Sequence, residues 1–510
     1  GDAGWKEPVF QLPVSFYFFE LPFYRQLLSV VLVTTLAAAL AYFLTSRWAR
    51  LRGRDLQEIE VTALGEALDS PFLRGIAAFG LLALAARYYL DRYNILFADH
   101  GLLVGADWVA ERVDLPFYYA LIGAAVLGAG MVFVGRWGLA IAVIVVLNVA
   151  SMAVPRLVSA FYVKPSEITI QRPYVERHIE ATRAAYGLSS DKVREVEFPV
   201  QLDTGFNPAQ YRTHLEQVRL WDRTAYHDAV QQLQALRPYY NFTDTDVDRY
   251  WIADEKGNKQ IKHVLMTARE LDVRQVPEAR SRWNNPHFVY THGYGLVVSE
   301  ASRQTPDGMP EFLIKNAPPE IGKPWFKLTR PEIYFGEVVH EPVFVRTKQP
   351  EFNYPSGSEN VHSSYDGKGG IPIGSFGMKL AAAVANSDWN IIFTQFMTGE
   401  SRMMIRRRVA ERVEELAPFI RWDEDPYVVI TDAGRLVWMI DGFTTSDDYP
   451  YAKPMRRFNY IRNSVKATVD AYDGTVKMYV FDEADPIIRA YRRLFPTLFL
   501  DKSQMPADMR

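Results

Sequence analysis

The chain contains no cysteine among its 510 residues. This absence excludes disulfide bonds, thiolate metal ligands and cysteine nucleophiles. It does not exclude an oxidising compartment, because a domain of several hundred residues folds without disulfides. An excess of charge of one sign is also missing, since the formal net charge is −3. The sequence therefore gives no bulk electrostatic attraction to nucleic acid, and we expect no nucleic-acid partner.

Recognisable catalytic motifs are missing as well. Neither HExxH nor GxSxG occurs in the sequence, so it predicts no catalytic residue. No signal peptide is visible, and the chain begins at Gly1 instead of Met. From this start we expect a fragment of a longer protein, with further helices upstream.

Long apolar runs are present, and they are confined to the first third of the chain. A membrane span needs about 20 mostly apolar residues. The runs that approach this length are 27–44, 75–97, 115–134 and 138–161. The second is interrupted by Arg87 and Asp91, which can pair because they lie four residues apart on a helix. We predict an interfacial aromatic segment at 1–26 and transmembrane helices within 27–163.

Basic residues in short loops indicate which side of the membrane is cytoplasmic. The loop after the first run and the link between the third and fourth runs contain Arg47, Arg50, Arg52, Arg54, Arg74 and Arg136. The loop between the second and third runs is acidic instead. The pattern predicts a multipass protein in contact with the lipid bilayer, with everything after the fourth run outside the cytoplasm. No run has a central Asp or Glu, so an ion-coupled transporter would need polar groups in other helices.

Residues 164–510 have the composition of a water-soluble domain. Short apolar runs alternate with turn residues, which is typical of antiparallel strands. Two hairpins are clear, 427–441 turning at 432–434 and 465–482 turning at 473–474. The segment 371–417 has a helical pattern with an arginine stripe. The predicted fold is a membrane α-helical bundle followed by a large α+β extracytoplasmic domain with mainly antiparallel sheet.

One candidate metal site stands out. Its carboxylates occupy positions 1, 3, 5 and 12 of a calcium-loop register and belong to Asp244, Asp246, Asp248 and Glu255. Position 6 is Arg249, where such a loop requires glycine for its sharp turn. The alternative is a solvated acidic turn before a strand. Calcium is the one cofactor for which the sequence offers a candidate site.

Several long motifs resemble a known family. They are PVFQLPVSFYFFELPF at 8–23, KPSEITIQRPYVERHIEATRAAYGL at 164–188, YTHGYG at 290–295, YDGKGGIPIGS at 365–375, APFIRWDEDPYVV at 417–429 and FNYIRNSVKATVDAYDGTV at 458–476. The sequence resembles the bacterial multipass membrane proteins of uncharacterised protein family 0182. The resemblance implies further spans upstream, a large extracytoplasmic domain and location in the cytoplasmic (inner) membrane. It implies no established activity.

Two functions remain open at this stage. The first is a non-catalytic envelope protein that is a subunit of a larger membrane assembly and binds a protein partner or a second copy of itself. The second is an extracytoplasmic hydrolase acting on an envelope peptide, lipid or glycan. It would use acids and histidines of the β-rich region, such as His292, His340 and Glu341.

Overall fold

The computed structural model divides the chain into two compact units. It describes residues 5–51, 70–197, 205, 207–235, 237, 239–253, 257, 259–276, 282–322, 325–339 and 341–510. Unit 1 consists of Gly1–Val196, Thr445–Arg462 and Ala484–Ile487, and unit 2 consists of Glu197–Thr444, Asn463–Glu483 and Ile488–Arg510. Residues 164–196 and 445–462, which the sequence places in the outer domain, therefore group with the apolar helices.

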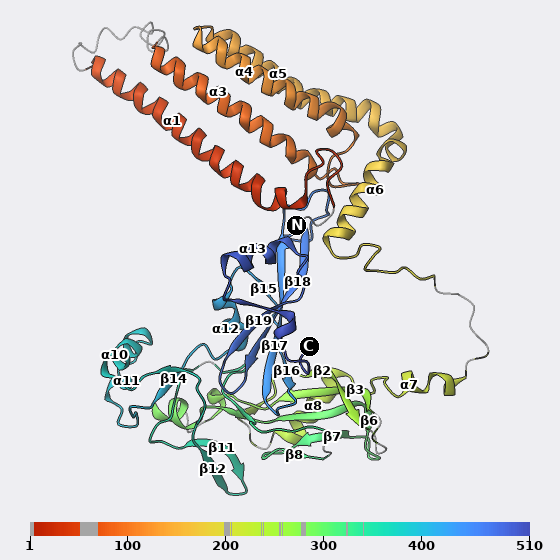
Figure 1. Ribbon diagram of the computed structural model, residues 1–510, viewed down its shortest axis with the longest axis vertical. Helices are drawn as coiled ribbons and strands as arrows, with labels where there is room; N and C mark the ends of the chain where they lie inside the picture. The colour runs from red at the N-terminus through yellow and green to blue at the C-terminus, as the bar shows by residue number, and fades with distance from the viewer. Residues whose placement is uncertain are drawn as a thin grey trace. The chain divides into compact units, whose positions relative to one another are not determined.

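Within the described residues of unit 1, four helices are long and apolar enough to cross a membrane. Their bounds are α1 (Leu21–Leu51), α3 (Pro71–Asp91), α4 (Leu115–Phe133) and α5 (Trp137–Val158). They run side by side, with α1 against α3, α3 against α4 and α4 against α5 (Figure 1). Their outward-facing side chains are largely apolar and exposed, which is the arrangement that a lipid environment stabilises. All four predicted spans are confirmed as such helices.

Short helical turns extend these helices at one end of the bundle. They are η1 (Phe16–Glu20), η2 (Arg92–Leu96), η3 (Ala110–Asp114), η4 (Ser159–Val163) and η5 (Lys164–Ser166), and the last leads into α6 (Glu167–Ala185). The aromatic segment before α1 packs into unit 1, because the Tyr17 ring is fully buried. Its centroid lies 6.0 Å from the ring of Tyr93 and 6.1 Å from the ring of Phe97.

A segment from late in the sequence completes unit 1. We call residues 445–462 the return segment, since the chain enters it from unit 2 and leaves it to unit 2 again. Tyr451 is fully buried, and its N–H donates to the Leu96 carbonyl (2.9 Å). The Tyr451 carbonyl accepts from Nδ1 of His178 (2.7 Å). Arg462 donates to the Ala184 carbonyl at the end of α6 (2.5 Å). These hydrogen bonds fix the return segment against helices that precede it by more than two hundred residues.

Unit 2 contains two main antiparallel sheets. The first has the order β2-β3-β6-β7-β8, and the second has the order β15-β17-β18-β19-β20 with β16 also paired to β17. The strands of the first are β2 (Asp246–Ala253), β3 (Lys259–Ala268), β6 (Leu296–Gln304), β7 (Pro310–Lys315) and β8 (Glu320–Ile321). Those of the second are β15 (Arg421–Trp422), β16 (Tyr427–Ile430), β17 (Leu436–Ser446), β18 (Tyr460–Asp470), β19 (Val476–Val480) and β20 (Phe499–Asp501). Among the pairs of named strands with a described register, β19–β20 is the parallel one.

Smaller elements cover these sheets. The short strands are β1 (Tyr240–Asn241), β4 (Glu270–Leu271), β5 (Gly293–Tyr294), β9 (Glu332–Ile333), β10 (Val343–Val345), β11 (Glu351–Ser356), β12 (Glu359–Ser363), β13 (Ile371–Pro372) and β14 (Arg402–Met404). The helices are α7 (Arg212–Leu215), α8 (Arg223–Gln234), α10 (Phe376–Ala385), α11 (Asn390–Phe393), α12 (Val409–Leu416) and α13 (Pro486–Leu494). At the core, the fully buried Trp438 donates from its indole N–H to the Phe335 carbonyl (2.8 Å). The α+β class predicted from the sequence is confirmed.

Both predicted hairpins are confirmed. In the first, Val429 pairs with Val437, and in the second, Val469 pairs with Val476. The turns use Gly434 (φ +78°) and Gly474 (φ +69°), in the left-handed region that glycine enters without strain.

The helical pattern of 371–417 is confirmed only in part. The structure places α10, α11 and α12 there, separated by turns and by strand β14. Ser387 and Arg406 adopt positive φ (52° and 50°), which interrupts any helix that would pass through them. The arginine stripe is divided accordingly, and Arg407 is buried in unit 2.

The contact between Gly105 and Tyr451 allows a test of the return segment. A Cβ atom at Gly105 would overlap the Tyr451 ring, and the backbone there has φ +109°. Gly105→Ala should lower the free energy of unfolding by about 2–4 kcal/mol, since it adds a steric clash to backbone strain. Gly101→Ala is the matched control, because its φ is +82° but nothing lies within 4 Å of the added atom. Its loss should be about 1 kcal/mol. Thermal unfolding of the whole chain in detergent measures both, and equal losses would contradict the proposed packing.

Candidate functional site

An acidic cleft in unit 2 is lined mainly by charged and polar side chains. Its volume is about 560 Å³, and its walls include side chains of β2 and of the segment before β16. Two hydrogen bonds join these walls. The Asp246 carboxylate accepts from the Val428 N–H (3.0 Å), and the Tyr250 hydroxyl accepts from the Ile430 N–H (2.9 Å). The cleft therefore lies where the first sheet meets the second.

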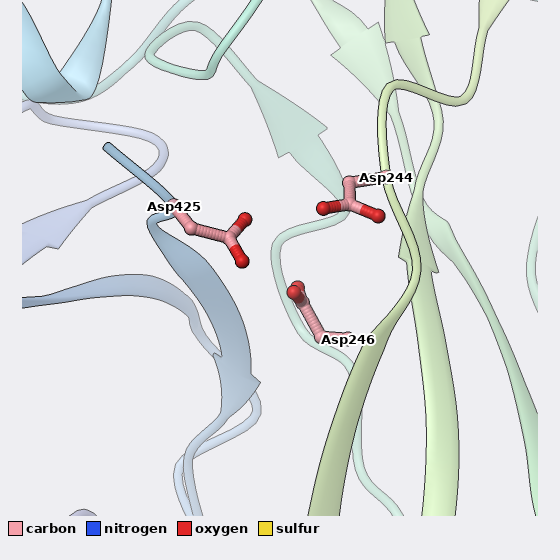
Figure 2. Close-up of side chains that lie close together, drawn as sticks. All are labelled: Asp244, Asp246 and Asp425. Carbon is pink, nitrogen blue, oxygen red and sulfur yellow. The ribbon is translucent and has the colours of Figure 1, made fainter. Parts of the chain in front are cut away.

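Three carboxylates converge in the cleft. Asp244, Asp246 and Asp425 each place an oxygen atom so that all three lie within 4.8 Å of one another. Figure 2 shows two of the side chains coming from the start of β2 and the third from the chain entering β16. Because β2 is adjacent to β16 in space and far from it in sequence, the cluster forms only when the two sheets have packed together.

A guanidinium neutralises part of this charge. Arg223, the first residue of α8, donates from Nε to Oδ1 of Asp244 (2.9 Å) and also pairs with the second carboxylate oxygen. Its Nη2 lies 3.9 Å from Oδ2 of Asp425. Arg223 therefore interacts with two of the three carboxylates. Among the described contacts, Asp246 accepts a hydrogen bond only from the Val428 N–H.

The electrostatics of the cleft favour protonation of Asp246. Partial burial raises the pKa of Asp246 to about 7, and the charges of Asp425 and Asp248 add to this, while the Val428 N–H and Arg223 oppose it. Glu337 is close enough to interact electrostatically with Asp246 and Asp425. Burial, together with the charges of Glu270, Asp246 and Asp425, raises its pKa to about 9. Asp246 therefore changes its protonation state near neutral pH, and Glu337 is protonated there.

The structure brings together two of the four predicted calcium ligands, Asp244 and Asp246. Asp248 lines the same cleft, but its carboxylate is not one of the three that converge. Glu255 lies outside the described residues. The segment forms the extended strand β2, paired with β3 from Asp246 to Ala253, and not a coiled loop. Calcium requires six to eight oxygen ligands, and Arg223 already pairs with Asp244. Calcium binding stays a prediction, and Asp425 is the member of the cluster that the sequence could not reveal.

The residues named for a hydrolase occupy a different part of unit 2. His292 is 1% exposed. The Thr291 hydroxyl accepts from Nδ1 of His292 (2.8 Å) and donates to the Glu351 carboxylate (2.5 Å). Burial pushes the pKa of Glu351 upward, but hydrogen bonds from His292 and its neighbours offset this and hold the pKa below its usual value. The ring of His292 is therefore part of a buried hydrogen-bond network.

Of the other two residues, the structure describes Glu341 alone. The Glu341 carbonyl accepts from Arg407 (3.1 Å), and its side chain is half-buried. His340 lies outside the described residues. Among the residues that the structure describes, His292 and Glu341 do not form a solvent-accessible catalytic group.

With this geometry established, comparison with known proteins gives the family. The whole of residues 1–510 matches the description "Uncharacterised protein family (UPF0182)". The chain belongs to this family. The resemblance noted from the sequence motifs is thereby confirmed, and the UPF0182 description names no activity.

Curated UPF0182 proteins from several organisms are similar to this chain. One from Solibacter usitatus (strain Ellin6076) is 53% identical over 521 residues, which cover 100% of this chain and 56% of that protein. One from Pelotomaculum thermopropionicum is 36% identical and covers 99% of this chain and 55% of the relative. One from Bradyrhizobium diazoefficiens is 37% identical, with 99% and 54% covered. The chain spans little more than half the length of these relatives. No solved structure matches it.

The raised pKa of Asp246 predicts a pH dependence of stability. The pKa of Asp246 is about 7 in the folded state, whereas in the unfolded chain it is 3.8, the ordinary value of an aspartate. The native chain should therefore lose stability as pH rises from 4 through 7. Asp246→Asn removes this loss and retains an oxygen to accept from Val428. At pH 8 it should be more stable than the native chain by on the order of 2 kcal/mol, with no difference at pH 4.

Unfolding measured at several pH values in detergent tests this prediction. Asp307→Asn, an exposed acid in the turn between β6 and β7, is the control and should show no such divergence. A difference between Asp246→Asn and the native chain that is the same at pH 4 and pH 8 would contradict the assignment.

Proposed function

We propose that this UPF0182 chain is a membrane-anchored component of the bacterial cell envelope. Unit 1 anchors it in the cytoplasmic membrane, and unit 2 lies outside the cytoplasm and binds a protein partner within a larger assembly. The protein acts by binding and not by catalysis. The observation that carries the proposal is an exposed apolar surface on unit 2.

This surface lies on the neighbouring helices α10 and α11. Phe376, Leu380 and Val384 are spaced four residues apart and so form one stripe along α10, with Phe376 69% and Val384 60% exposed. Trp389 and Phe393 continue it around α11, 57% and 78% exposed. We call these five residues the α10–α11 surface.

The opposite side of the same helices is already used for packing. Ala382, Ala383 and Ile391 are buried in a cluster with Phe288 and Phe344. The helix α10 is thus apolar on both sides, and Lys379 is its one charged residue. A helix at the surface of a soluble domain normally has a polar outer face. An apolar outer face is typical of a surface that another molecule covers.

The composition of the surface favours a protein as the molecule that covers it. Large aromatic side chains such as Trp and Phe are enriched at the centres of protein interfaces, where they contribute most of the binding energy. We therefore expect a partner protein with a complementary apolar surface. A second copy of this chain or the lipid surface are the other possible occupants, and the experiment below separates them.

The side of the membrane is supported by the arginine-rich loops. Arg47 and Arg74 lie at or next to the ends of α1 and α3, and Arg136 lies in the link between α4 and α5, so the three belong to connections on one side of the bundle. Basic residues accumulate in the short loops that lie on the cytoplasmic side of a membrane. Unit 2 follows the fourth helix and so belongs on the opposite side. Among the described residues, no observation favours the hydrolase alternative.

Photo-crosslinking tests the partner-binding proposal. A photoreactive phenylalanine analogue at Phe393 should give one discrete crosslinked protein in intact cells, identified by mass spectrometry. The same analogue at Trp251, an exposed aromatic position on β2, is the control and should not give it. Val384→Asp should reduce the yield at least about fivefold, because loss of a buried apolar contact and a desolvated charge cost more than about 1 kcal/mol.

The identity of the product decides between the occupants. A different protein of fixed mass supports the proposal. Self-crosslinked dimers would assign the surface to a second copy, and lipid adducts alone, or the same products from Trp251, would contradict a protein partner.

A further inference from the structure

A groove between two membrane helices of unit 1 combines positive charge with an apolar wall. It lies between α1 and the end of α3 and has a volume of about 290 Å³. Its polar end is formed by Arg25, Ser29, Arg87 and Asp91. Its apolar wall is formed by Leu28, Leu32, Val33 and Leu90. We call it the α1–α3 groove.

Arg25, the first arginine of the groove, is fixed by one hydrogen bond but has a guanidinium N–H without an acceptor among the described residues. Nη2 of Arg25 donates to Oδ1 of Asn94 (2.5 Å). Its Nε is buried and has no hydrogen-bond acceptor among the described residues. A buried guanidinium N–H without an acceptor is costly, so this group favours a ligand that supplies oxygen atoms.

The second arginine leaves the polar end with a net positive charge. Nε of Arg87 lies 3.4 Å from Oδ2 of Asp91, so this pair uses one of the three nitrogen atoms of the guanidinium. The side chain of Arg87 is 61% exposed. Two guanidiniums and one carboxylate give the groove a net charge of one positive unit. Paired arginines at close range match the oxygen atoms of a phosphate.

The positions of these residues correspond to the depth of lipid headgroups. Arg25 lies near the start of the first candidate span and Arg87 near the end of the second, so both belong to the same end of the bundle. Exposed Phe23, Tyr24 and Tyr89 lie at the same level in the two helices. Aromatic residues accumulate at the boundary between membrane and water. Leu28 and Leu32 continue one helical turn at a time toward the middle of the span.

We propose that the α1–α3 groove binds an anionic phospholipid. Arg25 and Arg87 contact the phosphate, and one acyl chain lies along Leu28, Leu32 and Val33. A zwitterionic lipid has the same phosphate but adds a cation next to the two guanidiniums, so it binds more weakly. A free phosphate shares the headgroup chemistry but makes no use of the apolar wall.

Native mass spectrometry of the whole chain in detergent tests the proposal. Phosphatidylglycerol and phosphatidylcholine are titrated separately, and the first should bind more tightly. Arg87→Gln and Arg25→Gln should each weaken phosphatidylglycerol binding about fivefold, since one basic residue near a lipid surface contributes about 1 kcal/mol. Arg156→Gln, an exposed arginine in the last turn of α5, is the matched control and should change nothing.

Each remaining outcome has a defined meaning. Arg87 is largely exposed, so its variant keeps the fold even if Arg25→Gln does not. Equal affinity for the two lipids, or an unchanged affinity in Arg87→Gln, would overturn the proposal. Competition by millimolar inorganic phosphate would show that the groove recognises free phosphate, and would overturn the lipid as its ligand.

Discussion

The burial of Tyr451 is the interaction on which the organisation of unit 1 depends. Its ring fills the space that Gly105 leaves, and its backbone bonds to both Leu96 and His178. Through it, a segment that follows strand β17 becomes part of the helical unit. The strands β17 and β18 are therefore the elements of the sheet whose end residues belong to unit 1. Burying a large aromatic side chain stabilises such a contact by about 2–3 kcal/mol.

The features that the sequence predicts correctly are those with a strong local signal. Apolar runs of about 20 residues predict the four helices because no soluble element needs such length. The hairpins at Gly434 and Gly474 are predictable because their turns require residues that tolerate positive φ. The pairing of Arg87 with Asp91 follows from helical spacing alone and is confirmed.

The features that the sequence does not reveal depend on contacts between distant segments. Nothing near Asp425 indicates that it joins Asp244 and Asp246, because their approach depends on two sheets packing together. The same holds for Tyr451, whose partners precede it by hundreds of residues. The helical pattern of 371–417 misled for a related reason. Its apolar residues pack into a core or cover the outer face of α10 and α11, and the helices end where Ser387 and Arg406 take positive φ.

The two proposed binding surfaces differ in chemistry and therefore suit different ligands. The α1–α3 groove is charged at one end and apolar along its wall, as a lipid requires, whereas the α10–α11 surface is apolar throughout and rich in aromatic side chains. The acidic cleft fits neither role, because Arg223 already neutralises part of its charge and partial burial raises the pKa of Asp246 to about 7. It is a partly buried acidic junction between the two sheets of unit 2.

The proposed topology places unit 2 outside the cytoplasm and the arginine-rich links inside it. Because the chain has no cysteine, single introduced cysteines report accessibility without background. Asp307→Cys lies in the exposed turn between β6 and β7, and Val134→Cys lies in the exposed link between α4 and α5. A membrane-impermeant maleimide applied to spheroplasts should label the first at once and the second only after the membrane is permeabilised. Labelling of Val134→Cys in intact spheroplasts, with Asp307→Cys protected, would contradict the account.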